Sequence, residues 1–215
     1  MNRRLQMRMP LLALLGFLLL SSCASMSKDE CLQADWYIKG LEDASEGYVI
    51  SRMADHGKAC ARVKVIPLMT DYEAGHEKGA RLYCVPEKGY SSGRAGSAYN
   101  DICPQDLENQ FLRAYRDGQE LFALQQQINR MSNEISSNES RVEVIYSEIQ
   151  ALHFDVSNRI NDSRERQYKL RRIDELHFQI TDLEVRSDRA AYELELFRHD
   201  FRIVESKHYR LGYIQ

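Results

Sequence analysis

Cysteine and histidine side chains are the groups in this sequence with the clearest capacity for chemistry. His56 and Cys60 are four residues apart, which would place them on one face of a helix at a spacing that metal ligands use. The adjacent His76 and Glu77 could supply further ligands. In an exported protein, however, an even number of cysteines favours disulfides over metal binding. We therefore predict no metal site and no cofactor, and we expect Cys60 to form a disulfide.

The sequence offers little that would support catalysis. No serine or cysteine has a recognisable general base near it in the sequence. The glycines at 89–96 lack the Lys-Ser/Thr ending of a phosphate-binding loop. No pair of carboxylates stands in the context that a glycoside hydrolase needs. An enzyme, for instance a cell-wall hydrolase, is thus the last of three functional hypotheses, and we expect a protein that is not an enzyme.

The first 22 residues have the composition of an export signal. A basic start is followed by an apolar run at 10–20, which is shorter than the ~20 residues that span a bilayer. The sequence Leu20-Ser21-Ser22-Cys23 resembles the lipobox of bacterial lipoproteins, which implies cleavage before Cys23 and lipid attachment to its thiol. The alternative is an ordinary cleaved signal followed by an incidental cysteine. Because Ala24 follows the cysteine, the resemblance implies a periplasm-facing lipoprotein of the outer membrane, in preference to the inner membrane or the cell surface.

Charge limits the class of partner. Removal of residues 1–22 takes away three arginines and leaves 26 basic and 32 acidic residues, a net charge of −6. Nucleic-acid binding usually requires a basic face, so we predict no nucleic-acid partner. The expected partners are the membrane, through the lipid, and an envelope protein or an anionic envelope component.

Four cysteines remain after Cys23, and all of them precede residue 104. Three pairings are possible. The pattern of apolar residues predicts helices near 32–46, 50–62, 68–83 and 104–118, with a glycine-rich loop at 86–100. In that arrangement Cys31 and Cys60 lie at the ends of two antiparallel helices, and Cys84 and Cys103 bracket the loop. We predict the disulfides Cys31–Cys60 and Cys84–Cys103.

Glycine follows tyrosine by three positions at Gly40, Gly75 and Gly118. Small residues also recur four apart, as in Gly75 and Gly79, which places them on one helix face. Each glycine costs a helix roughly 1 kcal/mol relative to alanine. Close approach of two helix backbones is the ordinary compensation, so the pattern indicates packed helices. Strands and turns are the alternative interpretation.

Residues 119–205 contain neither proline nor glycine and carry two seven-residue hydrophobic repeats. The first runs from Leu121 to Leu152 and the second from Ile173 to Val204, with turn-forming residues between them. If the two segments form an antiparallel coiled coil, the residue numbers in each layer add up to 325. This register also pairs the two polar core positions, Asn138 and Ser187. The alternative is that one or both helices pair between chains.

The expected tip of this hairpin is basic. It carries six cations within a short span and few acids, which could meet phospholipid head groups, lipopolysaccharide phosphates or an acidic protein. The alternative is a solvated turn. The six residues are Arg159, Arg164, Arg166, Lys169, Arg171 and Arg172.

Between residues 31 and 120, glycine, aromatic and acidic residues recur at a characteristic set of positions. These positions include Asp35, Trp36, Gly40, Tyr72, Gly75, Gly79, Tyr83, Gly93, Gly96, Tyr99, Tyr115 and Gly118. The pattern resembles a proteobacterial lipoprotein family catalogued as domain of unknown function 2799. The resemblance implies an envelope lipoprotein without an established activity.

Together these patterns predict an all-α protein in which a small disulfide-stapled helical head precedes a long antiparallel coiled-coil hairpin. The expected segments are a signal peptide (1–22), a lipidated linker (23–30), the head (31–118), the hairpin (119–205) and a tail (206–215). We expect a structural or interaction protein of the envelope that acts as a docking arm or spacer. A module that binds a glycan or small ligand with residues 83–99 is the first alternative.

Overall fold

The computed structural model describes residues 25–160 and 162–213, and these are helical with no strand among them. Cys23 and the signal segment lie outside the described residues. The described chain divides into two compact units. The first comprises residues up to Cys84 together with Asn100–Leu107, and the second comprises Val85–Tyr99 and the residues from Glu108 onward. The prediction of an all-α fold is confirmed.

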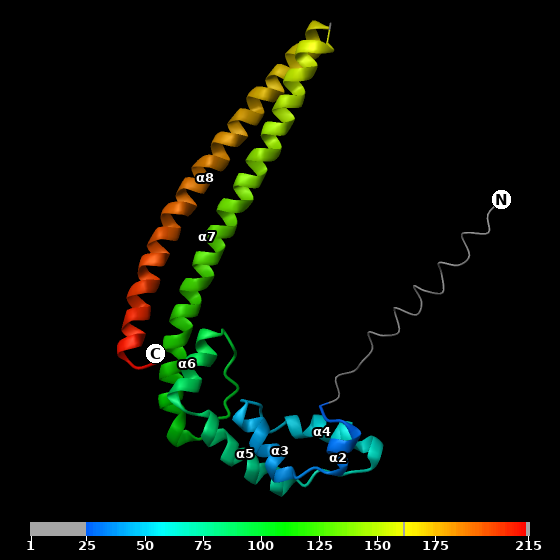
Figure 1. The fold of residues 1–215 in the computed structure, drawn as a ribbon, viewed down its shortest axis with the longest axis vertical. Helices are drawn as coiled ribbons and strands as arrows, with labels where there is room; N and C mark the ends of the chain where they lie inside the picture. Colours follow the sequence, from blue (N-terminus) through cyan, green and yellow to red (C-terminus); the bar gives the residue numbers. More distant parts are fainter. Residues whose placement is uncertain (1–24, 161, 214–215) are drawn as a thin grey trace, which may run out of the picture. The chain divides into compact units, whose positions relative to one another are not determined.

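From residue 25 onward, the described part of the first unit includes the α-helices α2 to α5, which Figure 1 labels, and one 3-10 turn. Its short N-terminal helix is stabilised by a capping box between Ser27 and Glu30. Asp35 caps the next helix by accepting the Ile38 amide at 3.1 Å. The helices are α2 (Lys28–Leu32), α3 (Trp36–Ser45), α4 (Arg52–Cys60), η2 (Ala61–Val63) and α5 (Met69–Tyr83).

Helices α3 and α5 are in backbone contact. A Cβ atom at Gly40 would collide with the carbonyl oxygen of Tyr72, and one at Gly75 would collide with that of Tyr37. Gly75 lies against Tyr37, and Gly79, four residues later on α5, lies against Leu41, four residues later on α3. The two helices therefore run parallel. The glycines therefore lower helix propensity but permit a separation that no larger residue would allow.

Both predicted disulfides are present. Cys31 bonds Cys60 and Cys84 bonds Cys103, with Cα–Cα distances of 5.4 and 5.6 Å. Cys31 belongs to the separate helix α2 and not to the helix expected at 32–46. Trp36 and Tyr72 pack in the same core cluster as the Cys31–Cys60 disulfide.

The second unit contains α6 (Pro86–Arg94), α7 (from Glu108 to Asn158 of the helix Gln105–Asn158) and α8 (Ser163–Arg210). The prediction of a loop at 86–100 is wrong for residues 86–94, which form α6. Proline is favourable in the first turn of a helix, because no N–H is needed there for a hydrogen bond within the helix. Helix α6 packs on α7 as α3 packs on α5. A Cβ atom at Gly93 would meet the carbonyl oxygen of Tyr115, and one at Gly118 would meet that of Tyr90.

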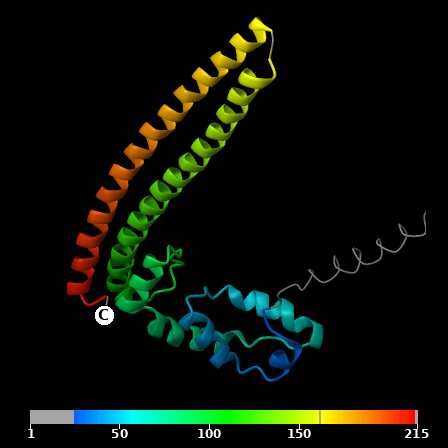
Figure 2. The ribbon, with the colours of Figure 1, turned by 45° about the horizontal axis from the view of Figure 1, so that its top comes forward.

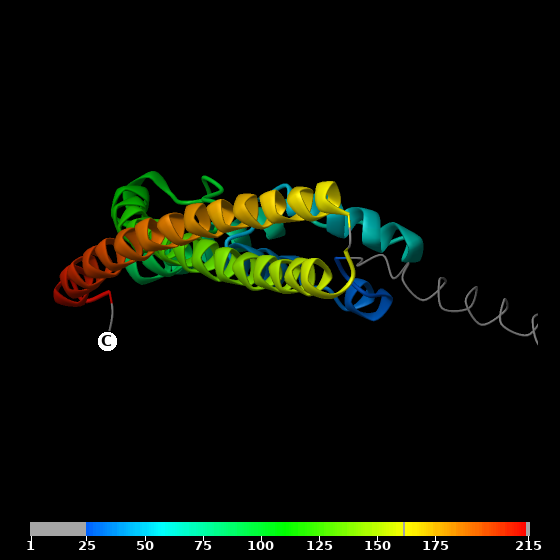
Figure 3. The ribbon, with the colours of Figure 1, turned by 90° about the horizontal axis from the view of Figure 1, so that it is seen from above.

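Helices α7 and α8 lie side by side as an antiparallel hairpin (Figures 1, 2 and 3). Its core clusters join residues whose numbers add up to 325, for example Ile149 with Leu176 and Met131 with Leu194. Asp162 caps α8 by accepting the Arg164 amide at 2.7 Å. The predicted register and turn position are confirmed, and the hairpin forms within one chain.

The compact units are divided differently from the head and hairpin expected to meet at residue 118. Helix α7 continues through that position without a break. The physical reason is that Gly118 is buried against α6, so the residue expected to end a helix serves as a contact point inside one.

Candidate functional site

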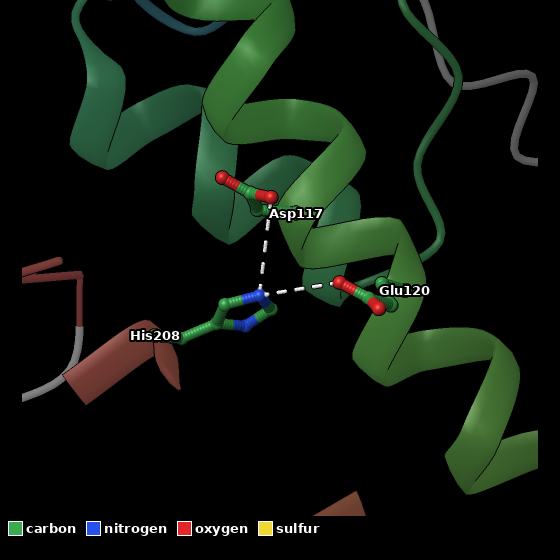
Figure 4. A group of neighbouring side chains, drawn as sticks. All are labelled: Asp117, Glu120 and His208. Carbon is green, nitrogen blue, oxygen red and sulfur yellow. Dashed lines mark ion pairs between the residues drawn. The ribbon is translucent and has the colours of Figure 1, made fainter. Parts of the chain in front are cut away.

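A cluster of polar side chains lies at the base of the hairpin, where the end of α8 meets α7 (Figure 4). Asp117 and Glu120 are one helical turn apart on α7, and His208 lies on α8. The His208 Nε2 atom is 3.9 Å from Asp117 Oδ1 and 3.5 Å from Glu120 Oε2. Two carboxylates and one imidazole nitrogen thus converge on a single point.

The imidazole of His208 is completely buried. Burial lowers the pKa of His208 from its ordinary value, and the attraction of Asp117 and Glu120 opposes this only in part. The other ring nitrogen, Nδ1, lies 3.4 Å from the Tyr90 hydroxyl. Among the described residues Nε2 makes no hydrogen bond of good geometry, and its nearest carboxylate oxygen is Glu120 Oε2 at 3.5 Å. A neutral imidazole with an unpaired nitrogen directed at two carboxylates is an arrangement suited to binding a cation.

One cation already approaches these carboxylates. The Lys207 ammonium is 3.2 Å from Glu120 Oε2 and 3.8 Å from Asp117 Oδ1. Its side chain is 48% exposed, so it can leave the cluster for solvent at little cost. Lys207 therefore neutralises part of the acidic charge, and its ammonium contacts the same two oxygen atoms that face His208 Nε2.

We did not predict this cluster from the sequence, although a signal for it was available. The numbers of Asp117 and His208 also add up to 325, so they form the next layer of the hairpin beyond Leu121 and Val204. We ended the repeat where its apolar residues ended. The hairpin continues for one further layer, and that layer is polar.

A second polar network lies inside the first unit. Asp43 is buried and its Oδ2 accepts hydrogen bonds from His56 Nε2 at 2.6 Å and from the Tyr72 hydroxyl at 2.7 Å. Burial raises the pKa of Asp43, but the hydrogen bonds from His56 and Tyr72 outweigh it and hold that pKa below its usual value. Arg52 Nε lies 3.4 Å from the other carboxylate oxygen. The network joins α3, α4 and α5.

The other nitrogen of His56, Nδ1, lies 2.9 Å from the Ser25 hydroxyl oxygen. Serine, histidine and aspartate in this order form the catalytic triads of hydrolases. Here the ring of His56 is completely buried, and Asp43 is shared with Tyr72. The three side chains tie the segment at Ser25 to the helices. The metal spacing of His56 and Cys60 is not used, because Cys60 is in a disulfide.

The residues that carried the family resemblance serve mainly to pack and cap helices. Gly40, Gly75, Gly79, Gly93 and Gly118 lie at the two helix contacts described above. Asp35 caps α3, and Trp36, Tyr72 and Tyr115 are buried. Gly96 has a φ of +69° just after α6, and the rings of Tyr83 and Tyr99 contact Gly47 and Phe111 respectively. In the segment 83–99, Tyr83, Gly93, Gly96 and Tyr99 thus contribute to packing.

The cations at the hairpin tip are mostly engaged within the chain. Lys169 lies 2.8 Å from Asp155, and Arg159 lies 3.5 Å from the same carboxylate. Arg172 lies 3.1 Å from Glu148. Arg166 donates to the Ile160 carbonyl at 2.7 Å. The tip therefore presents less free positive charge than the sequence suggests, with Arg164 and Arg171 exposed beside these pairs.

The outward face of α8 carries several exposed apolar residues among charged ones. Phe178, Val185 and Tyr192 are seven residues apart and are 78%, 62% and 68% exposed. Leu196 and Ile203 continue the stripe and are also exposed. We call these five residues the outer stripe. Four equivalent positions on α7 are polar and exposed, namely Gln126, Asn133, Ser140 and Ser147, whereas Phe154 and Val144 are exposed apolar residues on that helix.

Comparison with known proteins identifies one family. Residues 35–120 match the model of the family described as Protein of unknown function (DUF2799). The match covers α3 to α6 and the first part of α7. No curated protein and no solved structure matches the chain. Among the helices of residues 25–160 and 162–213, none combines the length and the apolar character needed to cross a membrane.

Proposed function

We propose, from the premise that residues 35–120 belong to the DUF2799 family, that this chain is a lipid-anchored envelope protein whose hairpin docks a partner through the outer stripe. The observation that supports docking is the exposure of Phe178, Val185 and Tyr192 at seven-residue spacing. Isolated apolar residues on a surface are ordinary, whereas exposed apolar residues that recur on one helix face favour an interaction site. The seven-residue spacing is the period of one of the two seam positions of a coiled coil, so the fitting partner is an amphipathic helix.

Charge beside the outer stripe favours a basic partner helix. Residues three or four positions away are neighbours on a helix surface. Around Phe178, Val185 and Tyr192 such neighbours include five acids and one base: Asp174, Glu175, Asp182, Asp188, Glu195 and Arg189. A helix with lysine or arginine beside its apolar residues would complement this surface.

The same charges disfavour a second copy of this chain as the partner. If the outer stripes of two copies packed antiparallel about Val185, Asp182 of each copy would lie close to Asp188 of the other. Like charges placed together across an interface are unfavourable. We therefore assign the stripe to another envelope protein. The hairpin tip is a weaker candidate for the contact, because four of its six cations are already paired or hydrogen-bonded.

The lipid anchor rests on the N-terminal sequence. Cys23 follows a short apolar run and two serines, and acylation there would hold the protein at a membrane surface. Cys23→Ser should abolish incorporation of a labelled fatty acid and release the protein from the membrane fraction. Retention of both in the variant would refute the anchor without affecting the docking proposal.

Site-specific photo-crosslinking in intact cells tests the docking proposal. A photoreactive residue at position 185 should give one discrete product with a different protein, whereas one at position 140 on the outward face of α7 should give none. Phe178→Asp with Tyr192→Asp should abolish the product, and the matched changes Ser140→Asp and Ser147→Asp should preserve it. Charge reversal by Asp182→Lys with Asp188→Lys should also reduce it.

Three results would contradict the proposal. Equal crosslinking from positions 185 and 140 would show that the stripe is not selective. A product that contains two copies of this chain would show that the partner class is wrong. A product that survives both aspartate substitutions on α8 would show that the stripe does not form the contact.

A further inference from the structure

The polar layer at the base of the hairpin combines a buried imidazole with two carboxylates. His208 is completely buried, yet its Nε2 atom makes no hydrogen bond of good geometry. A buried polar atom of this kind is unfavourable unless a ligand satisfies it. Figure 4 shows that this nitrogen faces the carboxylate oxygens of Asp117 and Glu120. The ligand that fits this geometry is a cation that can bind the nitrogen lone pair and both carboxylates at the same time.

We propose that Asp117, Glu120 and His208 bind a divalent transition-metal ion of the zinc class, which joins α7 to the end of α8. The three ligand atoms lie within 4.8 Å of one another. Bonds of about 2.0–2.2 Å to one ion place its ligands roughly 3–3.5 Å apart. The two distances from His208 Nε2, 3.5 and 3.9 Å, are already close to that range. Small rotations of the partly exposed carboxylates bring the set to bonding distance.

The kind of ligand selects the kind of ion. Magnesium and calcium prefer oxygen ligands, whereas an imidazole nitrogen suits zinc and its neighbours in the transition series. Three protein ligands leave a fourth position for water in a tetrahedral site. The arrangement around the histidine also fits, because ligating histidines commonly use the second ring nitrogen in a hydrogen bond. Here Nδ1 of His208 lies 3.4 Å from the Tyr90 hydroxyl oxygen, which can accept a hydrogen bond from the Nδ1–H group.

Lys207 is a competitor for the same carboxylates. Its ammonium lies 3.2 Å from Glu120 Oε2, and a bound dication would repel it. Because the lysine side chain is 48% exposed, it can turn into solvent when the ion binds. Its removal should therefore tighten metal binding, which would not be expected if Asp117 and Glu120 served only to pair with Lys207.

The test is titration of the full chain with zinc alone. The protein is purified in detergent without a histidine tag and treated with a chelator, and binding is followed by calorimetry. We expect one ion per chain at this site. Glu120→Gln should weaken binding by about 10–100-fold or more, as loss of a ligand costs at least as much as loss of a supporting group. Glu148→Gln, which alters another α7 carboxylate beside a cation, should leave the affinity unchanged.

Two further measurements keep the proposal testable if a variant at the buried His208 does not fold. Lys207→Gln should bind zinc more tightly than the natural protein. Cobalt in place of zinc should give the visible absorption of a four-coordinate ion, and Asp117→Asn should change it. Zinc binding that is unaffected by Asp117→Asn and Glu120→Gln would assign the ion to other histidines and overturn the proposal, as would the absence of binding.

Discussion

Replacement of Asn138 by leucine should stabilise the hairpin, although it removes one of the two polar residues that the register pairs in the core. Asn138 is only 2% exposed, and its amide nitrogen Nδ2 has no hydrogen-bond partner. A buried unsatisfied donor costs about 1–3 kcal/mol. Leucine has a similar size and no polar atom, so Asn138→Leu should raise the free energy of unfolding by about that amount.

Thermal unfolding followed by far-ultraviolet circular dichroism measures this gain. For a protein of this size about 1 kcal/mol corresponds to 2–4 °C, so the Tm should rise by about 2–12 °C. Asn133→Leu is the matched control, because Asn133 is exposed on the outward face of the same helix. A surface change of this kind should alter stability by no more than about 0.5 kcal/mol.

A lower Tm for Asn138→Leu would refute the reasoning. It would mean that the amide is paired in solution, with Ser187 or with a buried water, and that the polar layer contributes net stability. An unchanged Tm would mean that water reaches the amide. A higher Tm would assign the polar layer to the choice of register at a cost in stability, as single polar core residues do in coiled coils.

Four other perturbations test the packing of the first unit. Gly40→Ala should destabilise the first unit by about 1–3 kcal/mol, because the added Cβ would collide with the Tyr72 carbonyl. The control Gly57→Ala should gain up to about 1 kcal/mol, because its Cβ would meet only Pro67 at 3.8 Å. Equal Tm values for the two variants would contradict the contact between α3 and α5. Tyr72→Phe removes a hydrogen bond to the Asp43 carboxylate and should cost about 1.5–3 kcal/mol by urea unfolding. Because the pKa of Asp43 is held below its usual value of 3.8, its contribution to stability should be present above that pH and lost as the pH falls further, and an acid titration that Asp43→Asn leaves unchanged would refute this. Reduction of both disulfides, which close separations of 29 and 19 residues, should cost about 3 kcal/mol each and lower the Tm.

Several features of the fold could be predicted because they depend on periodicity. The spacing of apolar residues determined the register of the hairpin. When paired core positions of α7 and α8 have residue numbers that add up to 325, every apolar position of one repeat meets a core position of the other. The positions of Cys84 and Cys103 on either side of a short segment made their pairing probable in advance, and the structure has it. These features are local, or they repeat along the chain, so the sequence records them directly.

Other features could not be read from spacing. The glycines at 89 and 93 fall in the segment 86–100, which we predicted to be a glycine-rich loop, although their four-residue spacing is that of one helix face. The structure places them in α6, where their missing side chains allow backbone contact with α7. The network of Asp43, His56 and Tyr72 combines residues from three helices, and nothing in their separate positions shows that they share one carboxylate.

The sequence by itself thus determined the helical class, the pairing of α7 with α8, their register and both disulfides, because periodic burial and covalent closure leave a mark in the order of residues. Only the tertiary structure decided which polar groups meet. It buried His208 beside Asp117 and Glu120, and it left Phe178, Val185 and Tyr192 uncovered. The physical reason is that burial and desolvation depend on neighbours that are distant in the chain, so the same residue type is a solvated charge in one place and a potential ligand in another.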